Sequence, residues 1–391
     1  MIELHEIHHY VVVVMAAMSV MIALSNKRFL DRLKLTNDLE RDEKEILEGF
    51  VSILVPARDE EDRIGQCLES LMSDPYQNLE VVVLDDNSKD RTAEIVHRCA
   101  SIDNRIRLIK GDALPPGWIG KHWASHQLSE AAVGEYLLFI DADTILAQGT
   151  VKSSLYEVQV RNADLLTAIP KRSAECTAER LMFPFIDWAV YCWLPIRAAH
   201  RVKNAYLSAT FGQFMLFNKQ SYKAIGGHEA VRDNIIDDFE LGRMTKRSGL
   251  KWVLMDGSEV VETLPYGGDL DALRGVSRSV FPALNYHLSI LAVFSVVILA
   301  LGFLPLLTLA EAAVSDQSER VFMFTSLASI LLMGFSWFLV CRRFNHNVLM
   351  VPLFPISIVV MVVVAYYSMF ANAFKFASWK DRETVGRRFR L

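Results

Sequence analysis

The sequence predicts an α/β domain with a parallel sheet, bracketed by helices that enter a membrane. Two observations predict it. Short apolar runs alternate with amphipathic stretches over about residues 45–265, an alternation typical of parallel sheets with right-handed crossovers. Uncharged apolar segments, each close to or at the length needed to cross hydrocarbon, occupy the two ends of the chain at residues 10–24, 288–310, 321–340 and 348–370.

The predicted elements alternate in order along the domain. The strands are β-branched or aliphatic runs that end at polar or turn-forming residues, and the helices are the amphipathic stretches between them. Strands are expected at residues 51–55, 79–84, 106–109 and 136–140, and helices at 64–71, 91–99 and about 238–248.

Acidic clusters follow three of these strands. They are Ala57-Arg58-Asp59-Glu60, Asp85-Asp86-Asn87-Ser88 and Asp141-Ala142-Asp143. Open α/β sheets bind ligands at the carboxyl ends of their strands, and like charges gathered there repel unless a cation or donor groups join them. Asp141 and Asp143 can converge on one hard divalent cation through oxygen. Because no Gly-x-Gly-x-x-Gly follows the first strand and no Gly-Lys-Ser/Thr loop is present, a metal-held nucleotide diphosphate fits better than a dinucleotide fold or a P-loop.

Basic residues set the expected orientation. Lys27, Arg28, Arg32 and Lys34 follow the first apolar segment, so the positive-inside rule places the large domain in the cytoplasm of a multi-pass cell-membrane protein. A cleaved signal peptide is the alternative, but no basic region precedes the apolar run. The expected divisions are an anchor and basic linker at 1–44, a catalytic domain at 45–280, and membrane helices with a basic tail at 281–391.

The last apolar segment has basic residues on both flanks. Arg342 and Arg343 precede it and the tail from Lys375 follows it, so both flanks favour the cytoplasmic side. A re-entrant hairpin broken near Pro352 and Pro355 reconciles them, and a full crossing with an external tail is the alternative.

Composition excludes other classes. The net charge of −5 and the absence of a basic, aromatic stripe argue against nucleic acid as a partner. The five cysteines show no paired spacing, as expected of reduced thiols without metal. His228, after Gly226-Gly227, is expected to be a structural or acceptor-side residue rather than a metal ligand.

Taken together, the motifs resemble the family 2 glycosyltransferases with a GT-A fold. The three acidic clusters, the first extended to Pro56, are followed in the family's order by Gly226-Gly227-His228 and Ile236-Asp237-Asp238. The stretches Leu114 to Ala124 and Gly212 to Phe217 are similar to a membrane-bound subset that includes hopene-associated and carotenoid glycosyltransferases. The resemblance covers about residues 50–290 and implies a nucleotide-diphospho-sugar transferase domain.

The resemblance implies a donor site for a UDP-sugar. Asp85 and Asp86 would meet the uracil, Glu60 the nucleoside, and Asp141 and Asp143 would hold Mg²⁺ or Mn²⁺ and the diphosphate. The remaining donor-side residues that it implies are Pro56 and Ala57, which line the pocket, and Lys121, for which a solvated helix charge is the alternative.

The resemblance also implies that Asp238 is the general base of an inverting transfer. An acceptor hydroxyl is a poor nucleophile near neutral pH, so a carboxylate must take its proton. Asp237-Asp238 stands where the family has Glu-Asp, which leaves open which carboxylate faces the acceptor. The alternative is a charge that favours the N-terminus of a helix.

Residues on the acceptor side are expected in an apolar, aromatic stretch at 181–196. It contains Trp188 and Trp193 and is expected to lie in the membrane interface and receive a lipid; a buried core helix is the alternative. The other acceptor-side candidates are Gly212, Gln213 and Arg278. No Arg-Trp pair occurs near Arg278, which disfavours a long polysaccharide product.

The sequence therefore predicts an inverting, metal-dependent glycosyltransferase that moves a sugar to a lipid-like or isoprenoid-type acceptor at the cytoplasmic membrane face. A polyprenyl-phosphate sugar synthase is the alternative enzyme. A transporter is disfavoured because the C-terminal apolar segments lack ionisable groups, and a non-catalytic scaffold because every acidic cluster is present.

Overall fold

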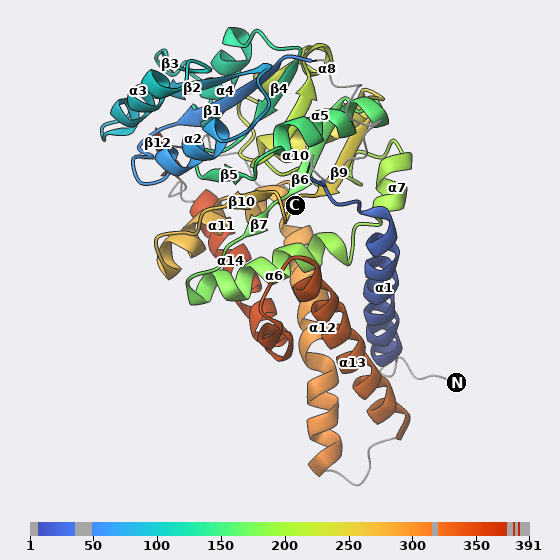
Figure 1. Ribbon diagram of the computed structural model, residues 1–391. Coiled ribbons are helices and arrows are strands. Elements are labelled where there is room, and N and C mark those ends of the chain that lie inside the picture. Colours follow the sequence, from blue (N-terminus) through green and yellow to red (C-terminus); the bar gives the residue numbers. More distant parts are fainter. Residues whose placement is uncertain (1–6, 36–48, 315–319, 374–377, 380–381, 384–391) are drawn as a thin grey trace.

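The computed structural model describes residues 7–35, 49–314 and 320–373, together with two short strands, β11 (Ser378–Trp379) and β12 (Arg382–Glu383). Parts of the expected anchor linker and of the basic tail lie outside these residues. The described chain forms a sheet domain from which a group of long helices projects (Figure 1).

A seven-stranded mixed sheet organises the domain, in the order β3-β2-β1-β4-β8-β6-β9. The first four predicted strands pair in parallel, as expected, but β8 runs antiparallel to both β4 and β6. The four predicted strands therefore form the parallel part of the sheet, and the antiparallel strand β8 is an addition that the sequence did not predict. The strands are β1 (Val51–Ala57), β2 (Leu79–Asp85), β3 (Ile106–Lys110), β4 (Tyr136–Phe139), β6 (Leu165–Ile169), β8 (Met215–Asn218) and β9 (Trp252–Asp256).

Helices cover both faces of this sheet, which explains its continuous apolar strands. Every residue of β1 is buried; Leu54 belongs to the apolar cluster on one face, and Ile53 and Val55 to the cluster on the other. The domain helices are α2 (Ile64–Met72), α3 (Thr92–Ile102), α4 (Gly120–Ala131), α5 (Thr150–Arg161), α6 (Thr177–Tyr191), α7 (Ile196–Arg201), α8 (Lys219–Ala224), α9 (Gly227–Ala230), α10 (Asp237–Arg247) and α11 (Asp269–Ala283).

A second sheet lies at the carboxyl ends of the central strands. Its strands are β5 (Thr144–Leu146), β10 (Val261–Thr263) and β7 (Lys171–Arg172), with β10 in the middle. This small sheet stands between the main sheet and the projecting helices (Figure 1). It brings residues 171–172 and 261–263 to the strand tips that carry the acidic clusters.

Four helical segments are long and apolar enough to cross a membrane. They are α1 (Ile7–Phe29), α12 (Leu288–Val314), α13 (Arg320–Arg343), and η3 (Val348–Leu353) joined to α14 (Phe354–Ala373). An ion pair fixes one end of the group to the sheet, because Arg343 Nε at the end of α13 lies 2.6 Å from Asp256 Oδ2 at the end of β9.

The chain turns back on itself between α13 and α14. At one end of α14, the backbone N–H of Phe281 in α11 donates to Ser368 Oγ at 3.0 Å. At the other end, Ile358 packs against Gly302 in the middle of α12. The carboxyl ends of α13 and α14 therefore lie on the same side, next to the sheet domain, which is the geometry of the predicted hairpin. A 3₁₀ turn containing Pro352 precedes the return.

Helix α6 crosses between the sheet domain and the projecting helices (Figure 1). Trp188 is 2% exposed, and its indole N–H donates to Ser336 Oγ of α13 at 2.9 Å. Its ring stacks on Trp337, with centroids 5.9 Å apart. Over Thr177–Tyr191 the alternative of a buried helix is therefore correct, because α13 covers the aromatic face that we expected to contact lipid.

Candidate active site

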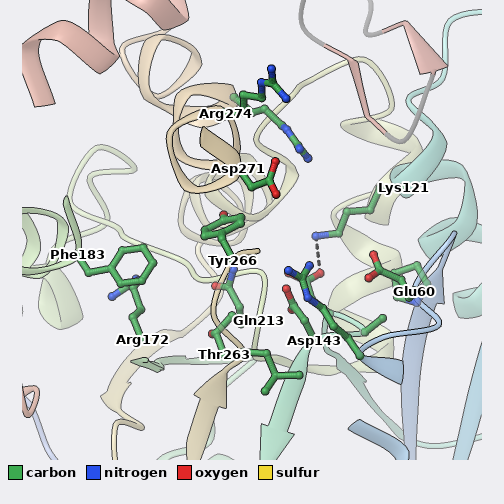
Figure 2. Close-up of a pocket in the computed structure, with 16 residues that line it drawn as sticks. Glu60, Lys121, Asp143, Arg172, Phe183, Gln213, Thr263, Tyr266, Asp271 and Arg274 are labelled. Carbon is green, nitrogen blue, oxygen red and sulfur yellow. Dashed lines mark ion pairs between the residues drawn. The ribbon is translucent and has the colours of Figure 1, made fainter. Parts of the chain in front are cut away.

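A cavity of about 620 Å³ opens at the carboxyl ends of β1 and β4, beneath α11. In Figure 2, Glu60 and Lys121 lie on one side of it, Arg172 and Phe183 on the opposite side, and Arg274 above them. Most of the lining is polar or charged, as a site for an ionic ligand requires. The lining residues are Pro56, Glu60, Arg63, Lys121, Asp141, Ala142, Asp143, Arg172, Phe183, Gln213, Thr263, Leu264, Tyr266, Asp271, Arg274 and Arg278.

Asp141 and Asp143 form an acidic pair just beyond β4. Lys121 Nζ, from the first turn of α4, lies 2.6 Å from Asp141 Oδ1, the ion pair dashed in Figure 2. Burial acts to lower the pKa of Lys121, but Asp141 and Asp237 together raise it above its ordinary value. Lys121 is therefore a fixed cation inside the cavity.

Asp143 lies deeper than Asp141. Burial, with Asp141 and Glu60 nearby, raises its pKa to about 7. Its Oδ1 atom is buried and has no hydrogen-bond partner among the described residues. An unsatisfied carboxylate oxygen beside a second carboxylate fits a divalent cation that prefers oxygen ligands. The described residues contain no group of three or more His, Cys, Asp or Glu side chains arranged to hold a metal ion, so diphosphate oxygens and water would complete the coordination.

The second acidic cluster lies beside the cavity rather than in its lining. Asp86 is 1% exposed; Arg58 donates to its backbone carbonyl at 2.6 Å and lies 4.0 Å from its carboxylate. Asp85 Oδ1 accepts the Ser88 N–H at 3.0 Å. Ala57 is fully buried in β1, whereas Pro56 and Glu60 do line the cavity. The contact of Asp85 and Asp86 with uracil remains a prediction.

Asp237 and Asp238 form a second acidic pair at the start of α10. Asp238 Oδ2 accepts the Gly212 N–H at 2.9 Å, and its Oδ1 accepts the Phe239 N–H at 2.7 Å. Burial, followed by the charge of Asp237, raises the pKa of Asp238 to about 7. A carboxylate with a pKa near the working pH is well matched to accepting a proton.

The pKa of Asp237 is shifted in the opposite direction. It is 6% exposed, and burial acts to raise its pKa, but His122, Lys121 and His228 hold that pKa well below its ordinary value. Asp237 is thus an anion with cationic or donor neighbours, whereas Asp238 can exchange a proton.

Gly212 connects the two acidic pairs. A Cβ atom built there would lie 3.4 Å from Asp238 Oδ2 and 3.7 Å from Lys121 Nζ. Its neighbour Gln213 lines the cavity. Asp238 is therefore at the edge of the same space that Asp141 and Asp143 enter.

Only some of the predicted acceptor-side residues lie at the cavity. Gln213 and Arg278 line the cavity, but Trp188 lies against α13 and Trp193 packs on Trp188, with centroids 5.6 Å apart. Neither tryptophan lines this cavity. The sequence did not single out Arg63, Arg172, Phe183, Thr263, Leu264, Tyr266, Asp271 and Arg274, most of which reach the cavity through the second sheet or α11.

Comparison with known proteins identifies the domain. Residues 52–226 match the model described as "Glycosyl transferase family 2". This stretch of the chain is therefore similar to glycosyl transferase family 2. This match confirms the predicted resemblance to the family, and the matched stretch contains the strand tips and the cavity-lining Lys121, Asp141 and Asp143.

Two curated relatives narrow the resemblance. The chain is 28% identical over 218 residues to a 4,4'-diaponeurosporenoate glycosyltransferase of Staphylococcus haemolyticus, covering 55% of this chain and 56% of that protein. It is 27% identical over 231 residues to the Staphylococcus aureus protein of the same name, covering 57% and 58%. The matched part thus spans little more than half of each relative's length.

A solved structure supports the fold. A mannosyltransferase from Pyrobaculum calidifontis, in complex with GDP-Man and Mn²⁺, matches with a TM-score of 0.53 and 15% identity, covering 96% of this chain and 100% of that one. The GT-A fold predicted from the motifs, with its long apolar helices, is confirmed at this level.

Proposed function

We propose that this protein transfers one sugar, with inversion, from a nucleotide diphosphate donor to a lipid-like acceptor at the cytoplasmic membrane face. One observation carries the proposal: a cavity beside the apolar helices is lined by an oxygen-only acidic pair and by a fixed cation at Lys121, and Asp238, with a pKa of about 7, lies at its edge behind Gly212. We expect the donor to be a UDP-sugar, from the resemblance of the three acidic clusters.

In the proposed donor complex, Asp141 and Asp143 would hold Mg²⁺ or Mn²⁺, and the ion would offset charge on the departing diphosphate. Lys121, paired with Asp141, adds a fixed positive charge on the same side of the cavity. Arg278 and Arg274 stand on α11, whose chain continues into α12, and they can hold diphosphate or an acceptor headgroup.

The transfer step requires one proton acceptor. Asp238 takes the proton of the acceptor hydroxyl while the acceptor oxygen forms its bond to the anomeric carbon of the sugar. The bond from that carbon to the diphosphate oxygen breaks, and the electron pair leaves with the diphosphate. Attack from the face opposite the leaving group inverts the anomeric centre, so no covalent sugar–enzyme intermediate is needed.

The names of the two Staphylococcus relatives support an isoprenoid-type acceptor. The apolar helices next to the cavity support a membrane location for it. The basic residues Arg342 and Arg343, at the sheet-domain end of α13, support a cytoplasmic orientation. A polyprenyl-phosphate sugar synthase is the second candidate, favoured by Arg274 and Arg278, which could bind an acceptor phosphate.

The direct test uses purified full-length protein, a panel of UDP-sugars and GDP-Man, and a membrane lipid extract, with mass spectrometry of the lipids. We expect a mass gain of one sugar on an apolar lipid, with Mg²⁺ or Mn²⁺ present. A ladder of many sugars, or no lipid product with any donor, would contradict the proposal. A product on a polyprenyl phosphate would select the second candidate.

Orientation can be tested separately. Ala373→Cys, at the exposed end of α14, should resist an impermeant thiol reagent in intact cells and react after permeabilisation. Modification in intact cells would refute the hairpin orientation.

A further inference from the structure

Two buried histidines enclose Asp237 beneath the proposed base. His122 Nε2, on α4, lies 3.6 Å from Asp237 Oδ1, and His228 Nε2, on α9, lies 3.3 Å from Asp237 Oδ2. Both rings are about 1% exposed, and they come from elements more than a hundred residues apart. A carboxylate with a histidine nitrogen at each oxygen is far more than the start of a helix needs.

The partners of His228 fix its tautomer. Tyr222 Oη lies 2.7 Å from His228 Nδ1, and the same oxygen accepts the backbone N–H of His228 at 2.9 Å. The carboxylate of Asp237 can only accept, so the facing Nε2 must carry the ring proton, and the tyrosine hydroxyl then donates its own proton to an unprotonated Nδ1. The ring proton is on Nε2, pointing at Asp237. Burial lowers the pKa of His228, which favours this neutral form.

His122 has the opposite pattern of partners. Its Nδ1 lies 3.4 Å from the carbonyl oxygen of Arg232, which can only accept, so Nδ1 carries a proton. In a neutral ring Nε2 would then present a lone pair to the carboxylate of Asp237, and the two would repel. A proton on both ring nitrogens removes that repulsion and gives Asp237 a counter-ion.

We propose that His122, as a buried imidazolium, and His228, as a neutral Nε2–H donor, are positioning residues that keep Asp237 ionised beside the base Asp238. This inference rests on the proposed function. The ionised Asp237 opposes ionisation of Asp238, so Asp238 retains affinity for the proton that it must take from the acceptor. The charged and titratable groups that face this pair are Lys121, His122, His228 and, behind His228, Tyr222.

Substitutions can distinguish the proposed roles of the two histidines, because one is charged and the other is neutral. His122→Gln removes the cation from an acidic pair that titrates as one unit. The pair then binds its proton more tightly, so the acidic limb of the kcat/KM profile, which reports the pair, should move upward by about one pH unit or more. His228→Gln replaces one neutral donor by another and should leave the limb in place. His126→Gln is the matched control, because His126 is one turn along α4, where its ring stacks on Trp123 and packs against Trp118 instead.

The inference is overturned if the acidic limb of His122→Gln coincides with that of wild type. It is also overturned if His228→Gln shifts the acidic limb as far as His122→Gln does. If His122→Gln does not fold, nitrogen-detected NMR of ¹⁵N-histidine-labelled wild type at neutral pH decides it. We expect two protonated ring nitrogens for His122 and one for His228; a neutral His122 ring would refute the proposal. This readout is independent of turnover, so an inactive preparation, or transfer that survives Asp238→Asn, would count against the proposed function alone.

Discussion

One acidic pair lines the cavity and a second lies at its edge, and their surroundings give the two pairs different chemistry. Asp141 and Asp143, at a strand tip, have a single lysine as their ion-pair partner, and one oxygen of Asp143 is buried without a hydrogen bond among the described residues. Asp237 and Asp238, at a helix start, are satisfied by two histidines and two backbone N–H groups. Among the described residues, the first pair therefore keeps a carboxylate oxygen without a donor, whereas each oxygen of the second pair has a histidine nitrogen or a backbone N–H beside it.

This difference suits the first pair to binding a metal ion and the second pair to accepting a proton. Oxygen ligands that lack protein donors attract a metal ion, whereas carboxylates held by donors keep their place when a proton arrives or leaves. A cation bound at Asp238 would have to displace the N–H groups of Gly212 and Phe239. The pairs should therefore respond differently to substitution and to metal removal.

The largest expected effect is on turnover in Asp238→Asn. The amide keeps the shape of the side chain but cannot take a proton, so turnover should fall by about 10²–10⁴. Donor affinity should stay within a few-fold of wild type, because the donor is held at the other pair. Turnover and UDP binding, measured on one preparation, check this. An equal loss in both would mean that Asp238 also holds the donor.

The next effect is on donor binding in Asp143→Asn. Loss of one charged ligand should weaken metal-supported UDP affinity by about 10- to 100-fold, from the strength of charge-assisted contacts. Calorimetric titration of UDP with and without EDTA gives the comparison. Equal wild-type affinity in the two conditions would remove the metal from the mechanism.

A smaller effect is expected in Asp237→Asn. Removing the like charge should lower the pKa of Asp238, so the acidic limb of activity should move down by about one pH unit. Turnover above the limb should stay within about tenfold of wild type, since the base remains. If Asp237→Asn is instead the inactive variant and Asp238→Asn the active one, the assignment within the pair is reversed.

The smallest effect is expected in Gly212→Ala. The added methyl would be in ordinary contact with Asp238 Oδ2 at 3.4 Å and with Lys121 Nζ at 3.7 Å, without a backbone clash. We expect a loss of only a few-fold in kcat/KM and a stable fold. A thermal unfolding midpoint measured beside the kinetics separates these effects; a collapse of donor affinity would show that this space belongs to the donor.

The strand tips were predictable because their signal is local. A strand covered on both faces is a nearly continuous apolar run, and a charged residue marks its carboxyl end, as at Asp85 and Asp141. The predicted strand bounds therefore agree with β1, β2, β3 and β4 to within two residues. The acidic clusters came together because β1 pairs in parallel with both β2 and β4.

The rest of the site depends on contacts between distant parts of the chain. Strands as short as Lys171–Arg172 have no readable periodicity, so Arg172 could not be placed in the cavity from sequence. Trp188 was expected to face lipid because its apolar run gives no sign of which partner covers it. His122 lies 115 residues before Asp237 in the sequence, and only the folded chain shows that they are neighbours.

The most direct test of the account is the pH dependence of kcat/KM for wild type and Asp238→Asn. Asp237 and Lys121 lie close to the carboxylate of Asp238, and its pKa of about 7 should make wild-type activity fall about tenfold per pH unit below that value. In Asp238→Asn the residual activity should show no such limb. A variant that keeps the wild-type limb would place the base elsewhere.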